Sequence, residues 1–193
     1  MPTRWSRSTV VAGVLGVLLA TVSFAPRALF AQPSLVVLVR HGEKSTEGGS
    51  DPSLSDAGRV RAQALADALA MTTPTAIIVS SLKRTAETAA VVSSKTGVVP
   101  TVIAIGGATH VADVAAAVRK ATGVVLVVGH SNTVPAIVTA LGGPKLPDIC
   151  DASYATMFVL TPGADGKSAQ VVLTHYGLAD GPLPVACAGM VAK

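Results

Sequence analysis

Apolar and polar positions follow two alternating patterns along most of the chain. Short runs rich in β-branched residues predict buried strands at residues 35–39, 76–79, 99–105, 124–128, 157–160 and 171–174. Stretches with apolar residues at helical spacing predict helices at residues 56–71, 82–95, 111–121 and 133–141. Strand and helix therefore alternate from about residue 35 onward.

This alternation predicts an α/β fold, because strands joined through helical crossovers form a mostly parallel sheet with helices on both faces. The last two predicted strands have no helix between them, which indicates an antiparallel edge. Aromatic residues make up only 3% of the chain, so the core is expected to consist of Val, Ala, Leu and Ile. No repeat or linker interrupts residues 32–193, which we expect to form one domain.

The first 31 residues have a different pattern. Arg4 and Arg7 precede an apolar run over residues 10–22, and small residues lead up to Ala31. This order is typical of a secretory signal peptide, with cleavage expected after Ala31. The alternative is an uncleaved membrane anchor, but the run is shorter than the roughly 20 residues that span a bilayer core. We therefore expect a periplasmic or secreted protein that has no membrane attachment after cleavage.

Charge and cysteine content narrow the classes of partner. The chain has a net charge of +4, but without the predicted leader it has 12 basic and 11 acidic residues. No basic tract interleaved with aromatic residues remains, which argues against nucleic acid as a partner. Cys150 and Cys187 are the only cysteines, and in an exported protein they either pair in a disulfide or stay as two small core residues. Neither has a second ligand at zinc spacing, so no metal site is predicted.

Three predicted strands end in residues suited to phosphate chemistry. These residues are Arg40, His41 and Gly42 after the first strand, Arg84 in the first turn of the helix after the second, and His130, Ser131 and Asn132 after the fourth. Ligands of α/β proteins bind beyond the carboxyl ends of the strands, where these side chains are expected to meet. Ser81 is expected to cap the helix that contains Arg84. His175 lies inside the sixth predicted strand, where an ordinary structural role is expected.

The chemistry of these residue types favours a phosphate ligand. An arginine in the first turn of a helix adds to the positive potential there, and a bound dianion offsets that cost. Guanidinium groups also fit phosphate oxygens in bidentate geometry. A neutral imidazole is a competent nucleophile when its other nitrogen is held by a hydrogen bond, often to a backbone carbonyl. His41 is the predicted nucleophile, and Gly42 is expected to let the backbone turn tightly and approach the ligand.

Four motifs in the chain resemble the phosphoglycerate-mutase-like branch of the histidine phosphatase superfamily. They are Arg40-His41-Gly42-Glu43, Leu54-Ser55-x-x-Gly58-x-x-Arg61-Ala62, Ser81-x-x-Arg84-Thr85-x-x-Thr88-Ala89 and Gly129-His130-Ser131. The resemblance implies a three-layer α/β/α sandwich and a phosphohistidine intermediate at His41. It also implies that Arg40, Arg84 and His130 complete the phosphate pocket, to which Gly42, Ser131 and Asn132 add substrate contacts.

The proton donor departs from the family pattern. Members with a known donor commonly carry a Glu in the stretch after the second motif arginine, whereas this chain has no Glu beyond Glu87. Only His110 and Asp113 occupy that stretch, and Asp113 is the predicted donor. Glu43 and Glu47, in the loop after the first motif, compete for the same role.

These observations predict a metal-independent phosphomonoester hydrolase that acts on a small phosphorylated substrate and uses no cofactor. Short loops indicate an open site, which suits a phosphatase better than a mutase, because a mutase must shield its intermediate from water. The alternatives are a phosphate-ester binding module with little turnover, a phosphohistidine protein phosphatase and a structural envelope protein. The sequence predicts neither the physiological substrate nor the oligomeric state.

Overall fold

The computed structural model describes residues 1, 3, 32–164 and 168–191. The predicted signal peptide lies outside the described residues, so the leader and its cleavage site stay predictions. The elements are β1 (Pro33–Arg40), α1 (Asp56–Ala68), β2 (Ala76–Ser80), α2 (Lys83–Thr96), β3 (Thr101–Ile103), α3 (His110–Lys120), β4 (Gly123–Gly129), α4 (Thr133–Ala140), β5 (Thr156–Pro162), β6 (Ala169–His175) and the short 3-10 helix η1 (Val185–Cys187).

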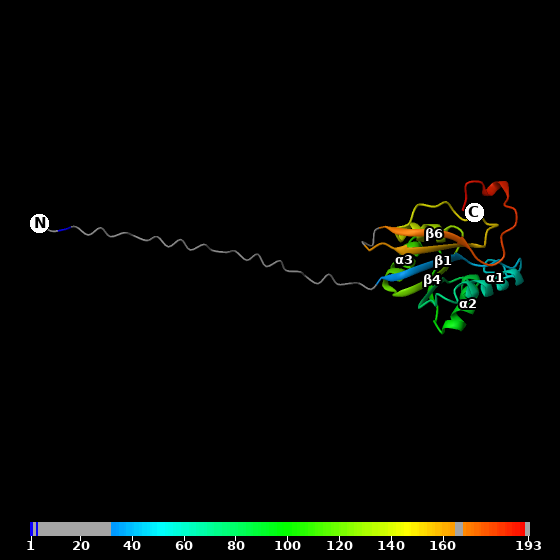
Figure 1. Ribbon diagram of the computed structural model, residues 1–193. Helices are drawn as coiled ribbons and strands as arrows, with labels where there is room; N and C mark the ends of the chain where they lie inside the picture. The colour runs from blue at the N-terminus through cyan, green and yellow to red at the C-terminus, as the bar shows by residue number, and fades with distance from the viewer. Residues whose placement is uncertain (2, 4–31, 165–167, 192–193) are drawn as a thin grey trace. The chain divides into compact units, whose positions relative to one another are not determined.

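The strands form one sheet in the order β3-β2-β4-β1-β5-β6 (Figure 1). The first four strands pair in parallel, whereas β5 runs antiparallel to both β1 and β6. The predicted α/β fold, mostly parallel with an antiparallel edge, is confirmed. The largest difference in bounds is β3, which is shorter than expected because it is an edge strand and Pro100 before it cannot donate to a ladder.

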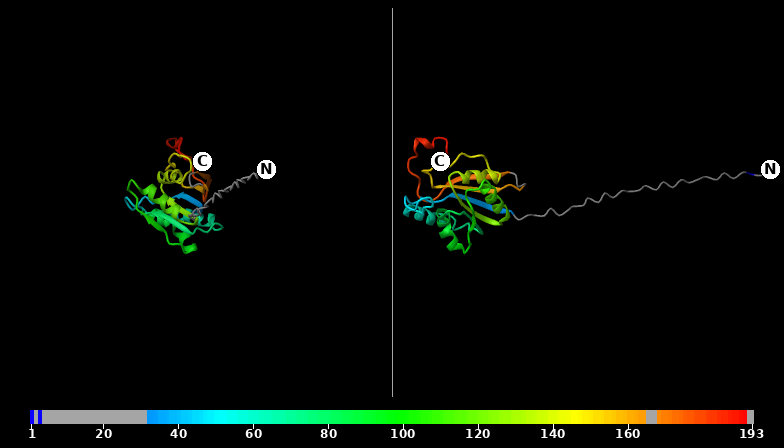
Figure 2. Two further views of the ribbon diagram at one scale, coloured as in Figure 1. Left: turned by 90° about the vertical axis from the view of Figure 1, so that its left-hand side faces the viewer. Right: turned by 180° about the vertical axis from the view of Figure 1, so that it is seen from behind.

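Helices cover both faces of the sheet and make three layers (Figure 2). Val36 and Leu38 of β1 pack in a cluster with residues of α3 and α4. Val37 and Val39, which point to the opposite face, pack with residues of α1 and α2. Because β1 is buried on both faces, its sequence is a continuous apolar run rather than an alternating one.

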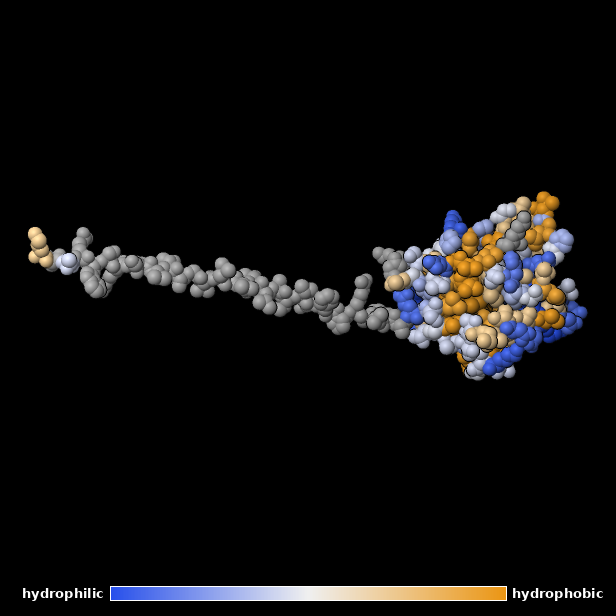
Figure 3. Space-filling view, viewed as in Figure 1, coloured by the Kyte–Doolittle hydropathy of each residue, from blue (hydrophilic) through white to orange (hydrophobic). Residues whose placement is uncertain are grey.

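The antiparallel edge is less completely buried. Figure 3 shows a band of apolar surface on the side where Figure 1 draws β6. Val172 of β6 is 61% exposed, whereas the side chains of β1 between Val36 and Val39 are almost fully buried. The parallel part of the sheet therefore provides the rigid support for any site at its carboxyl edge.

The start of α2 corrects one prediction. Ser81 does not cap this helix, because the N-cap position is one residue later, at Leu82, and makes no side-chain capping bond. The Ser81 hydroxyl instead accepts a hydrogen bond from the backbone N–H of Ile105, at 3.2 Å. The carboxylate of Asp51 accepts from the first helical N–H, that of Lys83, at 3.0 Å. An acidic side chain from a neighbouring loop thus takes the place of the predicted cap.

A disulfide joins Cys150, in the segment before β5, to Cys187 in η1, with the two Cα atoms 5.4 Å apart. A nearby β-bridge pairs Ile149 with Val191. The C-terminal segment is thereby held against the loop that precedes β5. In the part of the chain that the structure describes, none of the helices has the length and apolar character needed to span a bilayer.

Candidate active site

A hollow of about 400 Å³ lies where β1, β2 and β4 end, and we call it the carboxyl-edge hollow. Its lining residues are Arg40, His41, Lys44, Arg84, Ile105, His130, Ser131, Asn132 and Asp151. The structure thus brings together the two imidazoles and two guanidiniums that the strand ends predicted to meet. Parallel strands β1 and β4 pair directly, and the register that aligns Arg40 with Gly129 places His41 beside His130.

His41 is held as a neutral imidazole with one nitrogen free of a proton. Its Nδ1 donates to the carbonyl oxygen of Gly42 at 2.7 Å, and its Nε2 accepts from Nε of Arg84 at 3.1 Å. These two partners assign the proton to Nδ1 and the lone pair to Nε2. Burial, reinforced by the charge of Arg40, lowers the pKa of His41 to about 3. The ring is therefore neutral at neutral pH, and the lone pair on Nε2 is available for nucleophilic attack.

His130 is a second neutral imidazole beside the first. The centroids of the two rings are 5.3 Å apart in an edge-on arrangement. Nε2 of His130 is hydrogen-bonded to the hydroxyl of Ser80, at the end of β2, at 2.9 Å, which leaves Nδ1 for a ligand. Burial, followed by the charges of Arg84 and His110, lowers the pKa of His130 to about 4.

Arg40 is almost completely buried and has partners on only part of its guanidinium. Nη1 donates to three backbone carbonyls, those of Cys150, Asp151 and Ser153, at 2.9–3.0 Å. Nη2 lies 3.3 Å from the carboxylate of Asp151. The Nε atom is buried and makes no hydrogen bond.

Arg84 likewise keeps one buried donor without an acceptor. Its Nε donates a hydrogen bond to Nε2 of His41, whereas its Nη1 makes no hydrogen bond. The carboxylate of Asp51 lies 3.7 Å from that nitrogen, close enough for electrostatic attraction but too far for a hydrogen bond. A buried donor without an acceptor costs about 1–3 kcal/mol. An anion with several acceptor oxygens would satisfy both Arg40 and Arg84 at once.

The residues in the described part of the chain contain no group of three or more His, Cys, Asp or Glu side chains arranged to hold a metal ion. What the carboxyl-edge hollow presents to a ligand is instead a set of cationic and imidazole groups. Lys44 at its rim adds a third positive charge to those of Arg40 and Arg84. Asp151 is the acidic residue among the lining side chains, and it is ion-paired with Arg40.

The chain and its fold match those of known proteins. The model of the histidine phosphatase superfamily (branch 1) matches residues 36–104, a span that contains His41 and Arg84. Over these residues the chain resembles the histidine phosphatase superfamily. No curated protein sequence matches it.

Solved structures share the fold of this chain. A protein histidine phosphatase SixA, complexed with tungstate, is 17% identical with a TM-score of 0.58, and the match covers 73% of this chain and 96% of that one. A mycobacterial glucosyl-3-phosphoglycerate phosphatase, complexed with inorganic phosphate, is 23% identical with a TM-score of 0.52 and coverages of 75% and 97%. A structure titled mycobacterial hydrolase 1 is 22% identical with a TM-score of 0.54 and coverages of 72% and 96%.

The predicted substrate contacts fall into two groups in the structure. Ser131 and Asn132 line the carboxyl-edge hollow, whereas Gly42 does not. The N–H of Gly42 donates to the Thr88 hydroxyl at 2.9 Å, and a Cβ on Gly42 would lie 2.9 Å from the backbone oxygen of Gly58. The close approach that requires this glycine is therefore to α1 and not to the ligand, which corrects the prediction.

The structure places Asp113, the predicted proton donor, outside the hollow. The buried face of α3 consists of His110, Val114, Ala115 and Val118, and Asp113 is exposed on another side of the helix. His110 is the titratable residue on the buried face, with Nδ1 at 2.8 Å from the carbonyl oxygen of Ala104. The charge of His110 also contributes to the lowered pKa of His130.

The competing acids are engaged elsewhere. Both oxygens of Glu43 accept from Arg61, at 2.7–3.0 Å, which ties the loop after β1 to α1. Glu47 is exposed and lines a separate hollow that includes Asp51 and Lys83. His175 is exposed at the end of β6 and is not among the residues that line the carboxyl-edge hollow, in agreement with its expected structural role.

No motif or strand-end position singled out Lys44, Ile105, Asp151 or Tyr154 as site residues. The first three line the hollow, and the ring of Tyr154 lies against Arg40, with the guanidinium carbon 4.2 Å from its centroid. Asp151 and Tyr154 belong to an irregular segment that has neither strand nor helix periodicity. In this part of the chain the sequence indicates only Cys150, next to Asp151, as a disulfide candidate.

Proposed function

We propose that this protein is a phosphatase of the histidine phosphatase superfamily and that it hydrolyses phosphomonoesters through a phosphohistidine at His41, without a metal ion. One observation carries the proposal. Two buried donors without acceptors, Nε of Arg40 and Nη1 of Arg84, belong to arginines that line the same hollow as His41, whose Nε2 carries no proton. A phosphoryl group supplies the acceptor oxygens that the arginines lack and the electrophile that the imidazole needs.

In the first step Nε2 of His41 attacks phosphorus, and the bond from phosphorus to the ester oxygen breaks. Nδ1 keeps its proton throughout, and the carbonyl of Gly42 stabilises the positive charge that develops on the ring. The ester oxygen that has left takes up a proton from solvent. In the second step water attacks phosphorus and gives up a proton to solvent, the phosphorus–nitrogen bond breaks, inorganic phosphate is released and His41 returns to its neutral form. Arg40 and Arg84 stabilise the charge on the transferring oxygens in both steps.

The fold relatives add support. One of them is a mycobacterial phosphatase complexed with inorganic phosphate, and another is a SixA phosphatase complexed with tungstate, which is also a tetrahedral oxyanion. A hollow lined by Arg40, Arg84 and Lys44 is suited by charge to the same class of anion.

The absence of an obvious acid favours substrates with good leaving groups. The one carboxylate among the lining residues, Asp151, is paired with Arg40, and Asp113 lies elsewhere. When the phosphorus–nitrogen bond of phosphohistidine breaks, the leaving group is a neutral imidazole if its other ring nitrogen carries a proton. Dephosphorylation of phosphohistidine on a protein is therefore the second candidate function. Comparing an aryl phosphate, an alkyl phosphate and a phosphohistidine peptide separates the two, because an enzyme without a strong acid is slowest on the alkyl ester.

The principal test is hydrolysis of 4-nitrophenyl phosphate in the presence of EDTA. We expect His41→Asn to reduce kcat by at least about 10³-fold, because the nucleophile is lost. His175→Asn, on the exposed end of β6, is the matched control and should retain wild-type activity. Equal rates for the wild type and His41→Asn would overturn the proposal.

A pulse experiment distinguishes an enzyme from a binding module. The protein is mixed with a ³²P-labelled ester and denatured in alkali, which preserves phosphohistidine, at increasing times. A phosphohistidine that forms and disappears on the timescale of turnover is the expected result. A label that forms but persists after the free ester is removed would instead support the binding module.

We also propose that the protein is exported. The basic, apolar and small-residue segments of the first 31 residues motivate this proposal, and the pairing of Cys150 with Cys187 suits an oxidising compartment. Amino-terminal sequencing of the protein recovered from the periplasm or the medium is expected to begin at Gln32. Recovery from the cytoplasm with Met1 intact would contradict the proposal.

A further inference from the structure

Arg40 is held by one short segment far away in the sequence. Residues 150–154, which we call the clamp segment, provide three carbonyl oxygens to Nη1, from Cys150, Asp151 and Ser153. The same segment provides the carboxylate of Asp151 to Nη2, and the ring of Tyr154 lies against the guanidinium face. These contacts engage Nη1 and Nη2 of Arg40, whereas its buried Nε makes no hydrogen bond.

The clamp segment is anchored from two sides. Cys150 is joined to Cys187 by the disulfide, which fixes the start of the segment to η1. At its other end, the carboxylate of Asp180 accepts from the backbone N–H groups of Tyr154 and Ala155, at 2.9 and 3.1 Å. Neither anchor, Cys187 nor Asp180, is among the residues that line the carboxyl-edge hollow.

We propose that the clamp segment positions Arg40 for phosphate binding, with Tyr154 as a positioning residue, and that the Cys150–Cys187 disulfide makes this positioning sensitive to redox conditions. The inference rests on the proposed function, because it assigns a role in phosphate binding to Arg40. It extends that function to residues and a covalent bond that the reaction itself does not use.

The physical argument is one of orientation. A guanidinium binds an oxyanion well only when its N–H groups point at the oxygens, and misplacement by about 1 Å can cost as much as 10²-fold in rate. Three carbonyls on Nη1 and a ring 4.2 Å from the guanidinium carbon restrict both the position and the plane of Arg40. The loop that contributes them has no regular secondary structure of its own. Its geometry therefore depends on its anchors.

The redox step is an ordinary exchange with a dithiol. Cys150 is fully buried and Cys187 is partly exposed, so a thiolate of the reductant attacks the sulfur of Cys187 and Cys150 leaves as a thiolate. The second thiol of the reductant then displaces Cys187. The protein gains two electrons and two protons as two thiols, and the dithiol becomes a cyclic disulfide. The clamp segment loses its covalent anchor.

The first test replaces the ring of Tyr154. Tyr154→Ala is expected to raise both KM for 4-nitrophenyl phosphate and the Ki of tungstate by about tenfold, because the guanidinium loses the aromatic face that orients it. Tyr154→Phe keeps that face and should restore most of the affinity. The pH profile of kcat should be the same in all three proteins, since His41 is unchanged. An equal loss in the Ala and Phe variants, or a fall in kcat with no change in Ki, would overturn the role of Tyr154.

The second test breaks the disulfide without touching the hollow. Cys187→Ala, and the wild type reduced with dithiothreitol, are expected to show the same rise in KM and in the Ki of tungstate, by about three- to tenfold. A variant in which both cysteines are replaced by Ala is the control, because dithiothreitol should not change its kinetics further. Circular dichroism at the assay temperature confirms that each protein remains folded. Unchanged KM and Ki after complete reduction would remove the redox role.

Failure of the proposed function is distinguishable from failure of this inference. If the wild type hydrolysed no ester, the binding of inorganic phosphate, measured by calorimetry, would replace the kinetic readout. The inference then stands if Tyr154→Ala and reduction both weaken phosphate binding relative to Tyr154→Phe and the oxidised protein. It fails if phosphate binds equally well to all four.

Discussion

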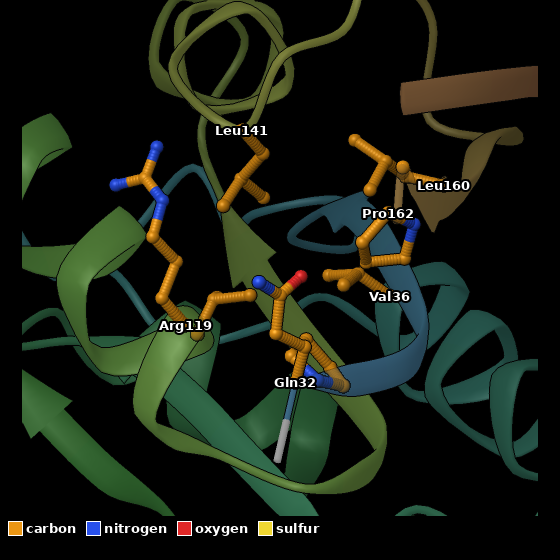
Figure 4. Close-up of a pocket in the computed structure, with 9 residues that line it drawn as sticks. Gln32, Val36, Arg119, Leu141, Leu160 and Pro162 are labelled. Carbon is orange, nitrogen blue, oxygen red and sulfur yellow. The ribbon is translucent and has the colours of Figure 1, made fainter. Parts of the chain in front are cut away.

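The two ends of the central strand β1 carry two different hollows. At its carboxyl end lies the carboxyl-edge hollow, with two arginines, two histidines and a lysine. At its amino end lies an amino-edge hollow, lined by Gln32, Pro33, Val36, Val118, Arg119, Leu141, Leu160, Pro162 and Gly163 (Figure 4). The amino-edge hollow has a volume of about 40 Å³, a tenth of that at the other end.

The difference between them lies in how their polar groups are satisfied. Apolar side chains such as Val36, Leu141 and Leu160 line the amino-edge hollow, and its arginine, Arg119, donates to the backbone carbonyl of Ala140. In the carboxyl-edge hollow, Arg40 and Arg84 each keep a buried donor without a partner. A buried group left unsatisfied in the folded protein needs an explanation, and a ligand is the simplest one here. Unpaired donors, and not enclosure, are therefore the reason that we propose the carboxyl-edge hollow as the substrate site.

Removing one of these unpaired donors is expected to lower kcat/KM more than any change at the amino-edge hollow. Arg84→Ala should reduce kcat/KM by about 10²–10³-fold, because the transition state loses a buried charged donor. Steady-state kinetics with 4-nitrophenyl phosphate measure the loss, and Arg40→Ala should lose a similar amount. The two losses should not add in the double variant, because both side chains bind the same phosphoryl group. Additive losses would mean that the arginines act at separate sites.

The stability of the protein at low pH should also depend on the carboxyl-edge hollow. The pKa of His41 falls from 6.5 to about 3 on folding, and that of His130 falls to about 4. Below pH 6.5 the unfolded chain binds protons that the folded protein excludes, so stability is fully present above that pH and is lost as the pH falls towards 4 and then 3. Each histidine contributes a slope of up to about 1.4 kcal/mol per pH unit in that window.

Urea unfolding at pH 7.5, 6 and 5 measures this dependence. His41→Asn should flatten the slope, because Asn does not titrate in this range. His175→Asn should leave the slope as in the wild type, since its side chain is exposed at the end of β6. If the wild type and His41→Asn lost stability in parallel between pH 6.5 and 5, the neutral state of the buried imidazole would not be the cause.

The same contrast explains how much of the site could be predicted from the sequence. Arg40, His41, Arg84 and His130 each follow a strand or begin the next helix, so the strand pattern alone placed them at one edge of the sheet. The clamp segment could not be found this way, because its contacts with Arg40 span more than 100 residues and arise in an irregular loop. Long-range packing, which local patterns do not encode, decides such contacts.

The structure differs from the predictions for Asp113 on α3 and Ser81 before α2 for a related reason. Sequence position alone predicts Asp113 as the proton donor, but the packing of α3 against the sheet turns His110 inward and leaves Asp113 exposed. Residue type alone predicts Ser81 as the cap, but the helix begins one residue later than such a cap requires, and the carboxylate of Asp51 supplies the acceptor. In both cases a neighbouring element that is distant in sequence decided the outcome.

The smallest expected effect comes from the amino-edge hollow. Arg119→Ala removes one hydrogen bond from an exposed side chain to the carbonyl of Ala140, which should cost about 0.5 kcal/mol or less in the free energy of unfolding. The kcat/KM for 4-nitrophenyl phosphate and the Ki of tungstate should equal those of the wild type. This variant removes the same cationic group as Arg84→Ala, so it controls for the change in net charge. A comparable loss in Arg119→Ala would mean that overall charge, and not the unpaired donors of the carboxyl-edge hollow, governs the binding of the anion.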